Sequence, residues 1–245
     1  MEILIKDDNL QFNIQNKYGY TGFHYACENG YLTIVEILIK VNNLDINRKI
    51  KGGYTGFDLA CEKGHLIILK LLIKDRRLKI NRENKYKYND FHLACSCNHF
   101  EIINFLIKNR VSDINSQNKY GMTSFHFSCM DKNYTMFEFL IKYDSLNINI
   151  QDENKNTGFH YACIEGNFAI IEMLIKDTRL EINNKNKHGN IGFHLACLKG
   201  DFAIIETLIK DTRVEINTKN NDGCTGFHLA CVRGHHVNKR YPYKD

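Results

Sequence analysis

Apolar and polar positions follow one another along the chain in a pattern that changes twice and then begins again. In the segment Thr21–Asn29, apolar residues fall on one side of a short helix, and Thr21 is suited to its N-cap. Gly30 provides a turn, and the next segment, Leu32–Lys40, is apolar on most sides, which predicts a second and largely buried helix. Residues 44–54 then alternate and end in glycines, which predicts an extended arm and a hairpin turn.

This unit of helix, turn, helix and hairpin recurs with a period of 34 residues. Two phrases keep that step, a heptapeptide close to Thr-Gly-Phe-His-x-Ala-Cys and the tripeptide Leu-Ile-Lys. The heptapeptides begin at Thr21, Thr55, Asn89, Thr123, Thr157, Ile191 and Thr225, and the tripeptides begin at residues 4, 38, 72, 106, 140, 174 and 208. We therefore expect a single domain over residues 1–245, with a partial first repeat at 1–20, six full repeats over 21–224 and a partial last repeat at 225–245.

Composition narrows the class of protein without naming a function. Hydrophobic residues make up 43% of the 245 residues, which is enough to bury a core, and the formal charge of +5 is too small to indicate a nucleic-acid binder. No apolar run approaches the roughly 18 residues of a membrane span. The first ten residues also lack the basic and apolar stretches of a secretory signal. We therefore expect an intracellular protein, in the cytoplasm or alternatively in the nucleus.

The repeated unit resembles the ankyrin repeat. The likeness rests on Thr-x-Phe-His-x-Ala at the first helix, a Gly between the helices and an Asn after the second helix, and it covers about residues 1–236. It implies an all-α repeat solenoid in which helix-turn-helix units stack and are joined by β-hairpin-like loops. The sequence departs from the usual ankyrin pattern in three ways. The position of Gly22, which usually holds Pro, is Gly in most repeats and Asp90 or Ser124 in two of them. Cys replaces the usual second Ala. The period is 34 residues in place of the usual 33 or so, with the extra residue after Leu-Ile-Lys.

Histidine and cysteine recur three residues apart, a spacing that must be tested against metal binding. The pairs are His24/Cys27, His92/Cys95, His126/Cys129, His160/Cys163, His194/Cys197 and His228/Cys231. Stacked helices lie roughly 8–10 Å apart, which is too far for sulfur ligands of one zinc ion or for a disulfide. Asp58 also interrupts the column. We therefore predict no metal site, buried free cysteines, and histidines that bridge threonine hydroxyls and backbone groups between repeats, a role that the ankyrin resemblance also implies.

The sequence offers little that points to catalysis. Cys97 and Cys224 lie outside the column, in positions expected to be exposed. Cys97 and His99 could be combined as a nucleophile and base, but no third orienting residue or oxyanion site accompanies them. Phosphate-binding glycine loops, paired carboxylates and Cys-x-x-Cys motifs are not found. We therefore expect a non-enzymatic chain without catalytic residues, cofactors or a small-molecule substrate.

A stack of repeats offers a partner one long surface, which in ankyrin-like stacks comprises the hairpin tips and the exposed side of the first helix. Basic and aromatic residues concentrate in the first four tips, and tyrosine is enriched at protein interfaces. The candidate partner-binding residues are Lys17, Tyr18, Tyr20, Lys51, Tyr54, Lys85, Tyr86, Tyr88, Lys119, Tyr120 and Met122. The exposed candidates on the first helices are Glu28, Glu62, Lys63, Asp131, Glu165 and Lys199.

These features favour a scaffold or adaptor that captures an acidic or tyrosine-complementary segment of another protein. Three alternatives stay open from the sequence. Lysines interleaved with tyrosines also suit nucleic acid, although acidic residues at positions 28, 62, 83 and 153 dilute the positive field. The repeats could instead be the docking segment of a longer enzyme or channel. The tip tyrosines could also pack only against adjacent hairpins.

Overall fold

The computed structural model describes residues 10–79, 84, 88–131 and 133–232. The chain divides into a first unit, Met1–Lys119, and a second unit, Tyr120–Asp245. The described helices of the first unit are α2 (Gly22–Glu28), α3 (Leu32–Leu38), α4 (Gly56–Lys63), α5 (Leu66–Leu72), α6 (Asp90–Ser96) and α7 (Phe100–Lys108). Those of the second unit are α8 (Ser124–Met130), α9 (Tyr134–Leu140), α10 (Gly158–Glu165), α11 (Phe168–Lys176), α12 (Gly192–Lys199), α13 (Phe202–Lys210) and α14 (Gly226–Val232).

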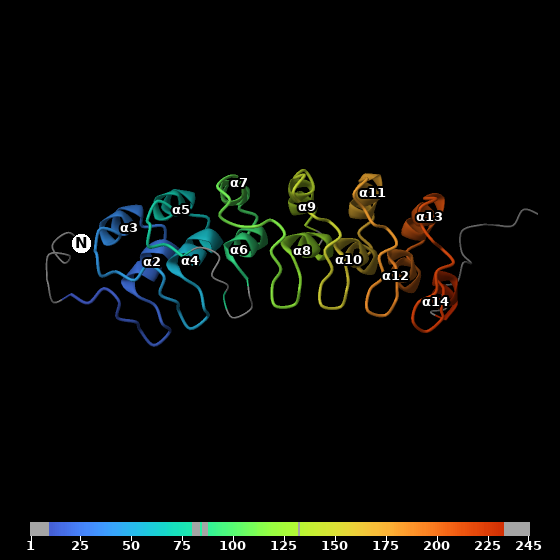
Figure 1. Ribbon diagram of the computed structural model, residues 1–245, viewed down its shortest axis with the longest axis horizontal. Coiled ribbons are helices and arrows are strands. Elements are labelled where there is room, and N and C mark those ends of the chain that lie inside the picture. Colours follow the sequence, from blue (N-terminus) through green and yellow to red (C-terminus); the bar gives the residue numbers. More distant parts are fainter. Residues whose placement is uncertain (1–9, 80–83, 85–87, 132, 233–245) are drawn as a thin grey trace, which may run out of the picture. The chain divides into compact units, whose positions relative to one another are not determined.

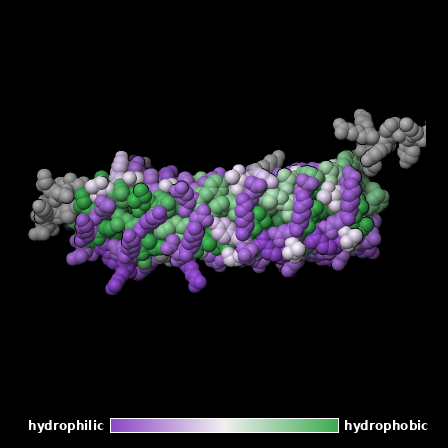
Figure 2. All heavy atoms as spheres, turned by 90° about the horizontal axis from the view of Figure 1, so that it is seen from above, coloured by the Kyte–Doolittle hydropathy of each residue, from purple (hydrophilic) through white to green (hydrophobic). Residues whose placement is uncertain are grey.

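Each unit is an all-α solenoid of stacked helix pairs, as the sequence predicts. The even-numbered helices are the first helices of the repeats, and they begin 34 residues apart. In each unit they pack against one another in one layer, and all except α14 also pack against their own second helix in the layer above (Figure 1). On the second-helix side, hydrophilic side chains stand in ridges with apolar surface between them (Figure 2).

The arms that join the repeats contain turns but no strands among the described residues. At the tip after α3, the Ile50 amide donates to the Tyr54 carbonyl at 2.9 Å, which closes a hairpin-like loop. Adjacent tips are joined by single backbone hydrogen bonds, such as that from the Lys51 amide to the Tyr18 carbonyl at 3.1 Å. The predicted β-hairpin-like loops are therefore present, and neighbouring tips hold one another in register.

The glycine that replaces the usual proline is explained by the packing between repeats. A Cβ atom on Gly56 would lie 2.6 Å from Cε1 of Phe23 and 3.0 Å from Sγ of Cys27, both in the preceding repeat. Gly158 meets Phe125 and Cys129 in the same way, at 2.8 and 2.9 Å. The distances to Phe23 and Phe125 are shorter than real Cβ contacts, so glycine fits closely at these two positions. Asp90 and Ser124 occupy the same position in two other repeats, so glycine is not required in every repeat. Where it is present, the glycine of one heptapeptide packs against the phenylalanine and the cysteine of the heptapeptide before it.

The histidine column bridges repeats, as predicted. His24 Nδ1 accepts from the Thr21 amide at 3.1 Å, so the proton lies on Nε2, which donates to the Arg48 carbonyl of the next arm at 2.8 Å. His126 and His160 make the equivalent contacts, and burial lowers the pKa of all three rings. The neutral imidazole therefore caps its own helix and fixes the following arm.

Arginines after the second helices supply a connection that the sequence did not reveal. The Arg77 guanidinium donates to the carbonyls of Ile39 at 2.6 Å and Val41 at 2.9 Å, at the end of the preceding second helix, and pairs with Asp75 at 2.7 Å. Arg179 makes the same contacts 102 residues later in the second unit. These bonds satisfy helix-end carbonyls that lack a glycine cap. The segment that carries the extra residue of the 34-residue period thus has a structural role.

Asp58 replaces the histidine of the column and remains buried. Its carboxylate accepts hydrogen bonds from the amide and the hydroxyl of Thr55, both at 2.7 Å. Burial raises the pKa of Asp58 to about 7; the Thr55 hydrogen bonds oppose this shift and the charge of Asp90 adds to it. The fold therefore favours the protonated carboxyl.

We expect Gly56→Ala to destabilise the chain by about 1–3 kcal/mol, because the new methyl group overlaps Phe23. Gly22→Ala is the matched control, since no atom lies within 4 Å of its Cβ position. Urea and thermal unfolding followed by circular dichroism measure both variants. The penalty at Gly56 should shrink in a Phe23→Leu background, and equal effects of the two alanines would contradict this packing account.

We also expect the stability advantage of Asp58→Asn over the wild type to depend on pH. Folding raises the pKa of Asp58 from 3.8 to about 7, so its contribution to stability is full below about pH 4 and is lost as the pH rises to about 7. The asparagine keeps the Thr55 contacts without the charge. It should match the wild type near pH 4 and exceed it by on the order of 1–4 kcal/mol at pH 8. A difference that stays constant in thermal melts across this range would show that the charge is not responsible.

Candidate functional site

The first two hairpin tips present a basic and aromatic surface. Lys17 and Lys51 are exposed, and the Tyr18 side chain is 57% exposed. Lys17 Nζ lies 4.9 Å from the centroid of the Tyr18 ring, within the range of a cation–π contact. Asn16 Oδ1 accepts from the amides of Tyr18 and Tyr20, which shapes the first tip. Lysines and a tyrosine of adjacent tips therefore lie together on the surface of the first unit.

The next tyrosine column is half-buried against the first helices. The Tyr20 ring lies 4.8 Å from Tyr25, and the Tyr88 ring lies 5.5 Å from His92 in its own repeat. Tyr54 is also half-buried. Each of these three side chains is partly exposed and partly packed against the protein. Their positions are therefore more restricted than that of Tyr18.

The remaining tip candidates differ in their exposure. Lys119 is half-buried and ends the first unit, whereas Tyr120 in the second unit is 49% exposed. Met122 is 8% exposed, so its side chain lies inside the repeat instead of on the tip. Lys85 and Tyr86 lie outside the described residues. On the first helices, Lys63, Asp131 and Lys199 are exposed, and Glu28, Glu62 and Glu165 are half-buried.

The net positive charge of the chain comes from the first unit. Residues 120–245 contain equal numbers of basic and acidic residues, so the formal excess of +5 lies within residues 1–119. A total taken over the whole sequence does not show this difference. The unit that carries the exposed Lys17, Tyr18 and Lys51 is therefore also the basic one.

The arrangement of the described cysteines and histidines does not indicate a metal site or a reactive thiol. They contain no group of three or more His, Cys, Asp and Glu side chains that could hold a metal ion, and their nine cysteines are free. Burial raises the pKa of five thiols of the column, to about 11 for Cys197, so these five stay protonated; they are Cys27, Cys61, Cys129, Cys163 and Cys197. Cys97 is exposed as predicted, and Cys224 is half-buried. The prediction of a buried thiol is wrong for Cys231, which is exposed on α14, the last described helix.

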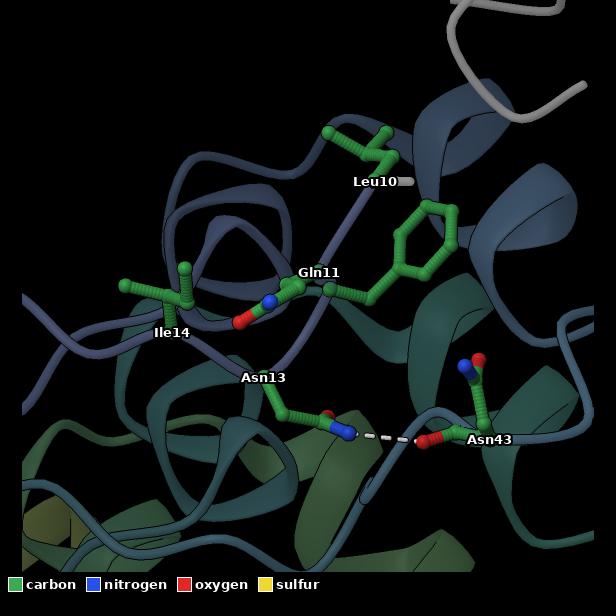
Figure 3. A pocket seen from close by; sticks show the side chains of 6 residues that line it. Leu10, Gln11, Asn13, Ile14 and Asn43 are labelled. Carbon is green, nitrogen blue, oxygen red and sulfur yellow. Dashed lines mark hydrogen bonds between the residues drawn. The ribbon is translucent and has the colours of Figure 1, made fainter. Parts of the chain in front are cut away.

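A pocket of about 330 Å³ lies beside the arm that precedes α2 (Figure 3). It is lined by Leu10, Gln11, Phe12, Asn13, Ile14 and Asn43. The Asn13 side-chain Nδ2 donates to the Asn43 backbone carbonyl at 2.6 Å across it, and the Asn13 side-chain Oδ1 accepts from the Asp45 backbone amide at 2.8 Å. Since none of the lining residues ionises, this pocket offers no acid, base or nucleophile.

None of the described helices has both the length and the apolar character needed to span a membrane.

Comparison with protein families identifies the repeats. A family described as ankyrin repeats (3 copies) matches residues 1–84 and 91–186, and one described as ankyrin repeats (many copies) matches residues 193–238. A search of curated protein sequences gave no match. Ankyrin repeats are generally protein–protein interaction modules, and proteins built from them are typically non-enzymatic scaffolds. The chain belongs to the ankyrin repeat family.

Proposed function

We propose that the chain is an adaptor that captures a segment of another protein on the hairpin tips and first helices of its first unit. The observation that carries this proposal is the set of exposed Lys17, Tyr18 and Lys51 side chains on adjacent tips that are joined by a backbone hydrogen bond. Tyr20, Tyr54 and Tyr88 extend this surface, and Lys85, Tyr86, Lys119 and Tyr120 continue the sequence pattern.

The chemistry of these residues indicates the kind of segment that fits. Tyrosine supplies a large contact area with few rotatable bonds to fix. The lysines and the excess positive charge of the first unit favour an acidic partner and speed its association. Met122 is left out of the proposed surface because it is buried.

The test compares two double variants of the full chain in affinity capture from native cell extract. Tyr18→Ala/Lys51→Gln changes the tips, and Tyr134→Ala/Lys142→Gln is the matched control on exposed positions of the second unit. Truncating a tyrosine that acts as an interface hot spot costs about 2 kcal/mol or more, so the tip variant should retain at least about tenfold less of the captured protein. The control should capture as much as the wild type.

Equal capture by the tip variant and the wild type would reject this surface. Nuclease treatment and a salt titration accompany the experiment, because a nucleic-acid partner would show steep salt dependence and would disappear with nuclease. Either result would favour the nucleic-acid alternative over protein capture. Circular dichroism melts of both variants show whether the repeats remain folded.

A further inference from the structure

Two carboxylates in the basic first unit lie next to each other at the ends of first helices. Glu28 is the last residue of α2, and Glu62 holds the same register position in α4, which packs against α2. The equivalent residues of the later repeats are Ser96, Met130, Ile164, Leu198 and Val232. The acidic pair therefore occurs only in the two repeats whose tips carry Lys17 and Lys51.

A pair of aromatic rings lies beside these carboxylates. The Tyr20 and Tyr25 rings are 4.8 Å apart and inclined by 31°, and Tyr25 is 45% exposed. Asn16 Nδ2 donates to the Tyr25 hydroxyl at 2.8 Å, and the Tyr20 hydroxyl reaches Glu28 Oε1 at 3.5 Å. Burial raises the pKa of Tyr20, and the charges of Glu28 and Glu62 raise it further, so both carboxylates act on this ring.

The acidic pair is held in place while staying accessible to solvent. The His65 and His99 side chains donate to the backbone carbonyls of Glu28 at 2.9 Å and Glu62 at 2.8 Å. Glu62 pairs with Lys63 at 3.1 Å, but both side chains are partly exposed, at 32% and 44%. Such an exposed pair contributes little to stability, so a cation from a partner can replace Lys63 at Glu62.

We propose that Tyr20, Tyr25, Glu28 and Glu62 receive a lysine or arginine side chain of the captured segment. Aromatic rings flanked by carboxylates attract a cation through the ring face and through charge-assisted hydrogen bonds. The captured segment then carries both acidic and basic residues. Its acidic residues contact Lys17 and Lys51 on the tips, and its basic residue contacts the carboxylates at the helix ends. Opposite charges at the two ends of the surface fix the direction of the segment and disfavour its reversal. This inference rests on the proposed function and adds the partner's charge pattern.

The test selects a phage-displayed library of random 12-residue peptides on the full chain. The enriched peptides should combine Asp or Glu with Lys or Arg. Synthesised with a fluorescent label, they are titrated against wild type, Glu28→Gln/Glu62→Gln and the control Glu36→Gln/Glu101→Gln, whose positions are exposed on second helices of the same unit. The first double variant should weaken binding at least tenfold and the control by less than twofold. Replacing the basic residue of the peptide by norleucine should weaken binding to the wild type and have little further effect on the Glu28→Gln/Glu62→Gln variant.

The outcomes separate this inference from the proposed function. Peptides that bind with the same affinity to wild type and Glu28→Gln/Glu62→Gln, but lose binding with Tyr18→Ala/Lys51→Gln, would overturn the inference and leave the tip surface standing. Enriched peptides without a basic residue would have the same meaning. Peptides that are insensitive to both variants, or a selection that enriches none, would overturn both proposals.

Discussion

Stacking within each unit depends on the close approach of one first helix to the next. Phe23 and Cys27 leave no space for a side chain at Gly56, and the same contact recurs at Gly158 in the second unit. Replacing the usual proline by glycine gives up some pre-organisation of the helix start. In return, a large ring is buried between repeats, where about 25 cal/mol per Å² of apolar surface is gained.

The polar contacts reinforce the same neighbour-to-neighbour connection. His24 joins its repeat to the next arm through Nε2, and Arg77 joins its arm to the end of the preceding second helix. Each group satisfies backbone atoms that a packed repeat would otherwise leave without partners. Because every such bond reaches only the adjacent repeat, stability within each unit is built up locally.

The sequence predicted the period, the helix pairs and the histidine bridges because these follow from residues that recur at fixed positions. It did not predict the contacts of Arg77 or the burial of Met122, because register fixes where a backbone lies but not where a flexible side chain points. Tyr20 and Met122 share a register position, yet one stacks on Tyr25 and the other is 8% exposed. The candidate site could therefore be predicted as a set of columns that includes Glu28 and Glu62, whereas the partial burial of the tyrosines and the position of Glu28 beside Tyr20 needed the structure.

The register position that Tyr20 holds in the first unit has a different role in the second unit. In the second unit, Asn156 and Asn190 take the place of the tyrosines, and their side-chain oxygens accept from the side-chain Nδ2 atoms of Asn186 at 3.0 Å and Asn220 at 2.9 Å. All four asparagines are buried, so these amides serve the connection between repeats and offer little to a partner. In the first unit Tyr20 and Tyr54 keep part of their rings at the surface. In this column, a partner therefore finds tyrosine contact area in the first unit, where the basic excess also lies, and this coincidence is why we propose recognition by that unit.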